Sequence, residues 1–205
     1  MDVMARMGAA LRRFHDRTAQ PATFDGRALA GKLLRYVERL EPIVGDREVL
    51  TQVRDAATGI GKLSQPAGLA STLKGIDIRN LLLAHDDGVV LLDPGRRKVT
   101  LPEADLARFL MTYRILWWGH PAFLIGFRPD AAAEAAFLRA YGHEEPAREA
   151  LFRAQMIKEL LKHWFTAHDS LKLKAFAPSV KRMLAKGWID PYYSSQLRAE
   201  IALLA

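Results

Sequence analysis

Apolar residues recur at every third or fourth position along most of the chain, which is the spacing of one face of an α-helix. Met7, Leu11 and Phe14 show this spacing near the start of the chain, and Arg12 lies off that face. Proline and glycine residues divide the pattern into separate segments. The pattern predicts helices over residues 2–18, 25–41, 45–62, 106–117, 130–140, 144–165, 178–186 and 191–204.

One short part of the chain follows a different pattern. Leu81–Leu83 and Val89–Leu92 are apolar runs too short for helices, and the Asp86-Asp87-Gly88 segment between them is typical of a tight turn. The two runs are therefore predicted to form a β-hairpin. Residues 64–71, which contain proline and glycine, are predicted to form a loop before it. The predicted fold class is mainly α, a helical bundle with one short central β-hairpin.

Two polar side chains flank this hairpin and form the first candidate site. Asn80 immediately precedes the first strand and Asp93 immediately follows the second, so the hairpin would bring them together. An amide oxygen beside a carboxylate suits Mg²⁺, which prefers hard oxygen ligands. The alternative is that Asn80 caps a turn and Asp93 caps the segment that follows Pro94. Spacing alone does not decide between the two interpretations.

Composition narrows the classes of function. The chain has 205 residues, a formal net charge of +7 and no cysteine. It therefore has no disulfide, thiolate metal site or cysteine nucleophile, and a reducing cytoplasm is the expected location. No apolar run has the length of a membrane span.

The positive charge suits anionic partners, but no nucleic-acid-binding signature accompanies it, so no nucleic-acid partner is expected. Neither a histidine–glutamate zinc pattern nor a Gly-x-Ser-x-Gly segment is present. The last third of the chain is rich in cations, which form either a solvated face or a docking surface for an anionic partner. These cations include Lys158, Lys162, Lys172, Lys174, Lys181, Arg182 and Lys186.

Four segments resemble, in order and spacing, the C-terminal lobe of the aminoglycoside phosphotransferase and choline kinase-like family, a branch of the protein-kinase-like fold. They are Gly8–His15, Asn80–Leu83, Leu91–Asp93 and Ala104–Ala107. The resemblance covers residues 5–120, and the helical tail, 121–205, matches the variable substrate-binding helices of that family. It implies that residues 1–205 form a single kinase-like C-lobe domain.

The resemblance also implies an activity. Asn80 and Asp93 would bind Mg²⁺ that bridges the phosphates of ATP, and Lys74 would contact the nucleotide. Asp105 would brace the catalytic loop. The implied reaction is an ATP- and magnesium-dependent transfer of a phosphoryl group to a hydroxyl of a small molecule, such as a sugar or a cell-envelope metabolite.

The candidate catalytic base is the first departure from the family pattern. The family places its catalytic aspartate five residues before the asparagine, and here that position is Gly75. The nearest acid is Asp77, which is the candidate base if the loop brings it to the attacking hydroxyl. The alternative is a structural ion pair between Asp77 and Arg79 or Lys74.

The second departure is the expected absence of the family's N-terminal lobe, which supplies a loop that covers the phosphates and a lysine that contacts the nucleotide. A partner chain or a second copy of this chain would then complete the nucleotide site, on a surface expected to be apolar. The alternative function is a catalytically inactive, kinase-like binding module that docks a partner protein or a polyanion.

Overall fold

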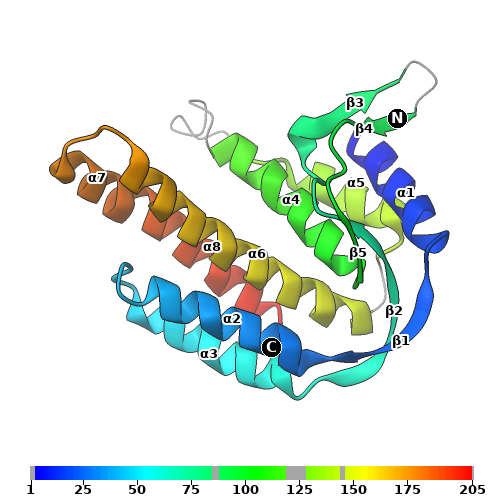
Figure 1. Ribbon diagram of the computed structural model, residues 1–205, viewed down its shortest axis with the longest axis horizontal. Coiled ribbons are helices and arrows are strands. Elements are labelled where there is room, and N and C mark those ends of the chain that lie inside the picture. Colours follow the sequence, from blue (N-terminus) through cyan, green and yellow to red (C-terminus); the bar gives the residue numbers. More distant parts are fainter. Residues whose placement is uncertain (1–2, 85–87, 119–127, 144–145, 205) are drawn as a thin grey trace. The chain divides into compact units, whose positions relative to one another are not determined.

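The computed structural model of the protein describes residues 3–84, 88–118, 128–143 and 146–204 (Figure 1). Helices dominate it, as the sequence predicts. In chain order the elements are α1 (Val3–Asp16), β1 (Gln20–Asp25), α2 (Gly26–Leu40), α3 (Arg47–Gly61), β2 (Ser64–Leu73), η1 (Ile78–Asn80), β3 (Leu81–Leu83), β4 (Val89–Leu91), β5 (Arg97–Thr100), α4 (Glu103–Trp118), α5 (Ala131–Tyr141), α6 (Pro146–Leu173), α7 (Pro178–Leu184), η3 (Ala185–Ile189) and α8 (Asp190–Ala202).

The chain divides into two compact units, each built from two separate segments. The first unit consists of Met1–Thr23 and Pro66–Phe152, and the second of Phe24–Gln65 and Arg153–Ala205. The long helix α6 passes from one unit into the other between Phe152 and Arg153. No helix in the described part of the chain combines the length and the apolar character that a membrane span requires.

The predicted hairpin is confirmed. β3 and β4 pair in antiparallel fashion, with Leu81 opposite Leu91 and Leu83 opposite Val89. The backbone amide of Ala84 donates to the carbonyl of Gly88 at 3.0 Å and closes the hairpin towards its turn. The turn residues 85–87, which include the two predicted turn aspartates, lie outside the described residues.

A three-stranded sheet in the order β1-β2-β5 is the main departure from the predicted elements. The segment predicted as a loop, 64–71, lies within β2, and its Pro66 and Gly68 did not prevent a strand. β2 pairs with β5 from Ala70 to Leu73, so Pro66 removes no hydrogen bond from that pairing.

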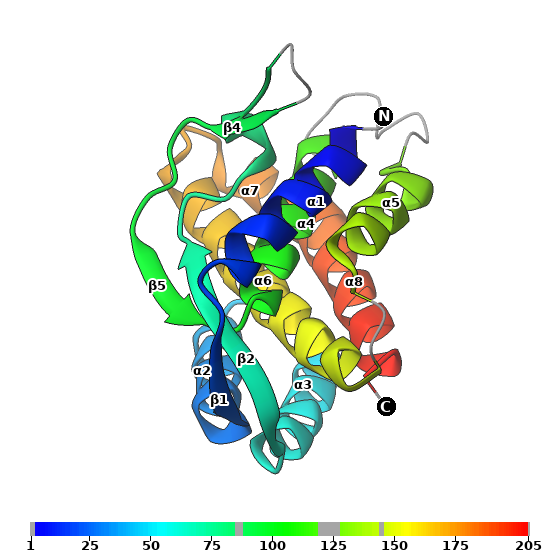
Figure 2. The same ribbon diagram turned by 90° about the vertical axis from the view of Figure 1, so that its right-hand side faces the viewer.

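One helix pair and a buried helix form the core of the first unit. α1 and α5 pack side by side (Figure 1 and Figure 2). Their backbones come so close that a Cβ on Gly8 would lie 2.2 Å from the carbonyl oxygen of Phe137. Phe137 also stacks on Phe109 of α4, with ring centroids 4.7 Å apart. α4 is buried on most of its sides from Glu103 to Tyr113.

The second unit is a set of packed helices. α2 packs on α3, and a Cβ on Gly26 would lie 1.8 Å from the carbonyl oxygen of Ile60. α8 packs on α3 and carries Tyr193, which stacks on the fully buried Trp164 of α6 at 6.0 Å between centroids. The indole of Trp164 donates to Asp190, so its polar atom is satisfied inside the core.

His143 gives the folded state a pH dependence. It is packed against Phe152, with ring centroids 5.0 Å apart, and burial lowers its pKa despite the attraction of Glu149 at 3.0 Å from Nε2. The unfolded chain therefore takes up a proton at a higher pH than the folded chain does. We expect the free energy of unfolding to fall as the pH is lowered through about 6.5.

Urea denaturation at a series of pH values measures this effect. The variant His143→Asn, which has no titratable ring, should show a smaller fall than the unmodified chain. Identical pH profiles for the two proteins would contradict the assignment to His143.

Candidate functional site

The loop between β2 and β3 is anchored to the start of α4. The carboxylate of Asp105 is fully buried, and its Oδ2 accepts a hydrogen bond from the backbone N–H of Leu73 at 2.8 Å. Nη1 of Arg108 donates to the carbonyl oxygen of the same residue, also at 2.8 Å. Both backbone groups of Leu73 are therefore held by side chains of α4. Asp105 therefore ties the end of β2 to α4, and its expected role in bracing a catalytic loop stays a prediction.

Asp105 also joins two other helices of the first unit. Its Oδ2 lies 3.3 Å from Nε2 of His15, at the end of α1. The other ring nitrogen of His15 lies 2.9 Å from the hydroxyl of Tyr141, at the end of α5. Burial raises the pKa of Tyr141 far above its usual range, so this hydroxyl keeps its proton. The network fixes the helix ends behind the loop.

The backbone around Gly75, the position compared with a catalytic aspartate in the family resemblance, leaves no room for a side chain. The N–H of Gly75 donates to the carbonyl oxygen of Pro94 at 3.1 Å. A Cβ on Gly75 would lie 1.9 Å from the carbonyl oxygen of Asp93. Gly95 closes the same turn with a φ of 61°, a left-handed conformation that favours glycine. The loop and the chain after β4 are thus in direct backbone contact.

The structure brings Asn80 and Asp93 to the same end of the hairpin. The N–H of Leu92 donates to the carbonyl oxygen of Asn80 at 2.9 Å, so Asp93 is the next residue along the chain from this pair. The amide nitrogen of Asn80 donates to the carbonyl oxygen of Gly75 at 3.2 Å, and Oδ1 of Asp93 accepts from the N–H of Gly95 at 3.3 Å. These are the turn contacts of the structural alternative. They involve neither Oδ1 of Asn80 nor Oδ2 of Asp93, which are the atoms that a cation would bind.

Asp77 forms the structural ion pair that the sequence left open. Its carboxylate accepts hydrogen bonds from the backbone N–H and from Nε of Arg79, both at 2.9 Å, and from Nη2 of the same residue. These hydrogen bonds raise the pKa of Arg79. To act as a base, Asp77 would have to release the guanidinium of Arg79.

Cations surround the end of the hairpin. Lys74 is exposed, and its backbone N–H donates to the carbonyl oxygen of Arg96. Arg97 and Lys98 begin strand β5 opposite Leu73 and Thr72, with their side chains exposed. The positive charges favour an anionic ligand near Asn80 and Asp93.

Asn80 and Asp93 by themselves would leave a metal ion at this position incompletely coordinated. No group of three or more histidine, cysteine, aspartate or glutamate side chains suited to a metal ion occurs among the residues that the structure describes. Mg²⁺ is commonly held by one or two protein oxygens together with the phosphates of a substrate. An amide oxygen and one carboxylate fit that pattern of incomplete protein ligation.

No protein-family model matches this chain, and no curated protein matches it.

Proposed function

We propose that this protein is a kinase-like phosphotransferase domain that binds ATP with Mg²⁺ at the end of its hairpin and phosphorylates a hydroxyl of a sugar or a cell-envelope metabolite. The observation that carries the proposal is the convergence of Asn80 and Asp93 at this end. The loop beside them is anchored by the buried carboxylate of Asp105.

The anchored loop supports binding because a metal site needs ligands held in place before the metal arrives. Asn80 is fixed by its hydrogen bond to Gly75, and the loop that contains both is tied to α4 through Leu73. Asp93 would supply the negative charge that attracts the cation. Lys74 and the other exposed cations would face the phosphates of the nucleotide.

Because Gly75 has no side chain that could act as a general base, the site would transfer a phosphoryl group only slowly. A general base contributes about 10²–10⁴-fold to such reactions, and this position offers no side chain. Asp77 is the remaining candidate base, and its carboxylate is held by Arg79. Positioning and electrostatic stabilisation supply most of the acceleration in phosphoryl transfer, so a site without a base would keep part of it.

A catalytically inactive binding module is the second candidate function. The pair formed by Asp77 and Arg79 favours it, together with the absence of space at Gly75. In either case the hairpin exposes Leu82, Val90 and Leu92, an apolar surface suited to the partner chain or second copy that would complete the nucleotide site.

Asp93→Asn should weaken the binding of Mg²⁺–ATP by about tenfold or more, because it removes the only charged ligand of the proposed metal pair. The amide oxygen that replaces the carboxylate can still accept from Gly95, so the turn should survive. Isothermal titration of ATP with and without Mg²⁺ measures the change. The control is Asp55→Asn, which makes the same change of charge at an exposed position of α3.

Failure of the unmodified chain to bind ATP more tightly with Mg²⁺ than without it would overturn the proposal. Equal affinities for the two variants would overturn the assignment to Asp93. Release of ADP, measured on the same samples, separates the two candidate functions: turnover supports the phosphotransferase, and binding without turnover favours the inactive module.

A further inference from the structure

The turn between α6 and α7 exposes large apolar side chains. We call residues 172–187 the α6–α7 tip; they belong to the second unit. Every residue from Lys172 to Val180 is exposed. Leu173 at the end of α6 is 87% exposed, and Met183 in α7 is 64% exposed. Phe176 between the two helices is exposed as well. Apolar exposure concentrated in this way marks an interaction site more often than scattered single residues do.

The α6–α7 tip also carries charge of one sign. Residues 170–189 contain five lysine or arginine residues and no aspartate or glutamate. Lys172 lies 3.7 Å from Asp169, just outside this segment. Lys174, Arg182 and Lys186 have no acidic partner among the residues that the structure describes. A surface that is both apolar and cationic fits an occupant that is both apolar and anionic.

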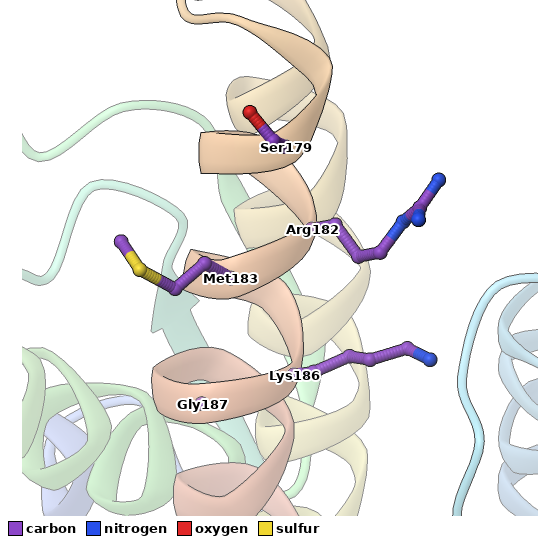
Figure 3. Close-up of a pocket in the computed structure, with 5 residues that line it drawn as sticks. All are labelled: Ser179, Arg182, Met183, Lys186 and Gly187. Carbon is purple, nitrogen blue, oxygen red and sulfur yellow. The ribbon is translucent and has the colours of Figure 1, made fainter.

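The two kinds of side chain leave the helix in different directions. Figure 3 shows Arg182 and Lys186 extending to one side of the helix and Met183 extending to the opposite side. A shallow pocket lies here, lined by Ser179, Arg182, Met183, Lys186 and Gly187. All of these residues belong to α7 and η3, one continuous helical stretch, and no second element among the described residues lines the pocket.

The shape of this pocket distinguishes between two anionic partners, an acidic peptide helix and a bilayer. An acidic peptide helix would need a groove with two walls to cover the apolar side chains. A bilayer needs no groove, because protruding apolar side chains enter it while long basic side chains reach the headgroups from the flanks of the helix. The protruding Leu173, Phe176 and Met183 match the second case.

We propose that the α6–α7 tip docks on a membrane surface that contains anionic phospholipids. Leu173, Phe176 and Met183 enter the boundary between headgroups and acyl chains. Arg182 and Lys186 contact the phosphates of the lipids. The docked protein lies on the membrane without crossing it. The inference rests on the second unit alone and does not depend on the proposed nucleotide site.

Co-sedimentation with vesicles tests the proposal. The full chain should bind vesicles of phosphatidylcholine with phosphatidylglycerol at least about tenfold more tightly than vesicles of phosphatidylcholine alone, and added salt should weaken the binding. Arg182→Glu/Lys186→Glu should weaken the binding about tenfold or more. The matched control is Lys32→Glu/Arg35→Glu, which makes the same change of charge at exposed positions of α2 in the same unit and should bind within about twofold of the unmodified chain.

A second variant tests the apolar contacts. Leu173→Ser/Met183→Ser keeps every charge and should also lose about tenfold or more in vesicle binding. Both altered side chains are exposed, so the thermal unfolding midpoint should stay unchanged. Absence of binding to anionic vesicles overturns the proposal, as does equal weakening by the α2 control. Unchanged binding of the serine variant overturns insertion. Retention on an acidic polypeptide without vesicle binding assigns the α6–α7 tip to a protein partner instead.

Discussion

Replacing Asp105 by alanine is expected to lower the free energy of unfolding by about 2–4 kcal/mol. The carboxylate is fully buried, and it accepts the hydrogen bond from the N–H of Leu73 while also contacting His15. The variant removes the partner of the Leu73 N–H and of the buried His15 ring, together with the charge beside Arg108, whose Nη1 lies 3.6 Å from Oδ1. Such orphaned polar groups cost the desolvation free energy that the native contacts offset.

Urea denaturation followed by circular dichroism measures this loss. Asp55→Ala in α3 is the control, because that side chain is exposed and should cost no more than about 0.5 kcal/mol. Asp105→Asn should fall between the two, since its amide oxygen can still accept from Leu73. A loss below about 1 kcal/mol for Asp105→Ala would show that the loop holds its position without this contact.

The elements that the sequence predicts correctly are those defined by local patterns. The apolar spacing in α4 predicts a helix from positions within a few turns, and the two short apolar runs predict the paired strands β3 and β4. The sheet β1-β2-β5 has no such signal. β2 contains Pro66 and Gly68, which are typical of loops, and its pairing with β5 joins residues that are far apart in the sequence. Pairing between distant segments overrides local propensity.

Some features of the candidate site could likewise be predicted from local sequence, and others could not. Asn80 and Asp93 could be placed together because a hairpin of known length lies between them. The choice between a base and an ion pair for Asp77 depends on the rotamer of Arg79, which spacing does not specify. The contact between His15 and Tyr141 joins the ends of α1 and α5 and was not predicted. Its only sequence signal is the helix ending in Phe-His that belongs to the family resemblance.

The domain organisation was the least accessible from sequence. A single domain with a core over 5–120 and a tail over 121–205 stays a prediction, whereas the structure groups the chain into units that each combine two distant segments. No linker composition marks these divisions. One of them falls inside α6, where the helical pattern continues without a break.

The acid expected at the position of Gly75 offers the sharpest test of the candidate site. Gly75→Asp introduces the residue that the proposed kinase-like relationship expects at this position, and a simple account of a degenerate enzyme predicts a gain of activity. We expect the opposite result: loss of Mg²⁺–ATP binding and a fall of about 1–3 kcal/mol in the free energy of unfolding. A Cβ at this position would lie 1.9 Å from the carbonyl oxygen of Asp93, which is backbone and cannot rotate away.

The expected loss of binding and stability follows from the backbone contacts that a side chain at residue 75 would break. To admit any side chain at residue 75, the loop must separate from the chain after β4, which breaks the hydrogen bond from Gly75 to Pro94. Asp93 would then move away from Asn80, whose amide is tied to the carbonyl oxygen of residue 75. Gly75→Ala should therefore lose metal-dependent binding as well, although alanine introduces no charge. Gly68→Ala in β2 is the control, because a Cβ there meets no atom within 4 Å.

Titration of ATP with Mg²⁺ and urea denaturation of the three variants distinguish the steric explanation from the explanation by a missing acid. If both Gly75 variants lose Mg²⁺–ATP binding and stability while Gly68→Ala matches the unmodified chain in both, the function of Gly75 is to allow the close backbone contact. Increased turnover in Gly75→Asp with unchanged stability would show that the loop can open and that the missing acid limits phosphoryl transfer. Because the acid and the alanine variants share the steric effect and differ in charge, their comparison assigns the result to one cause or the other.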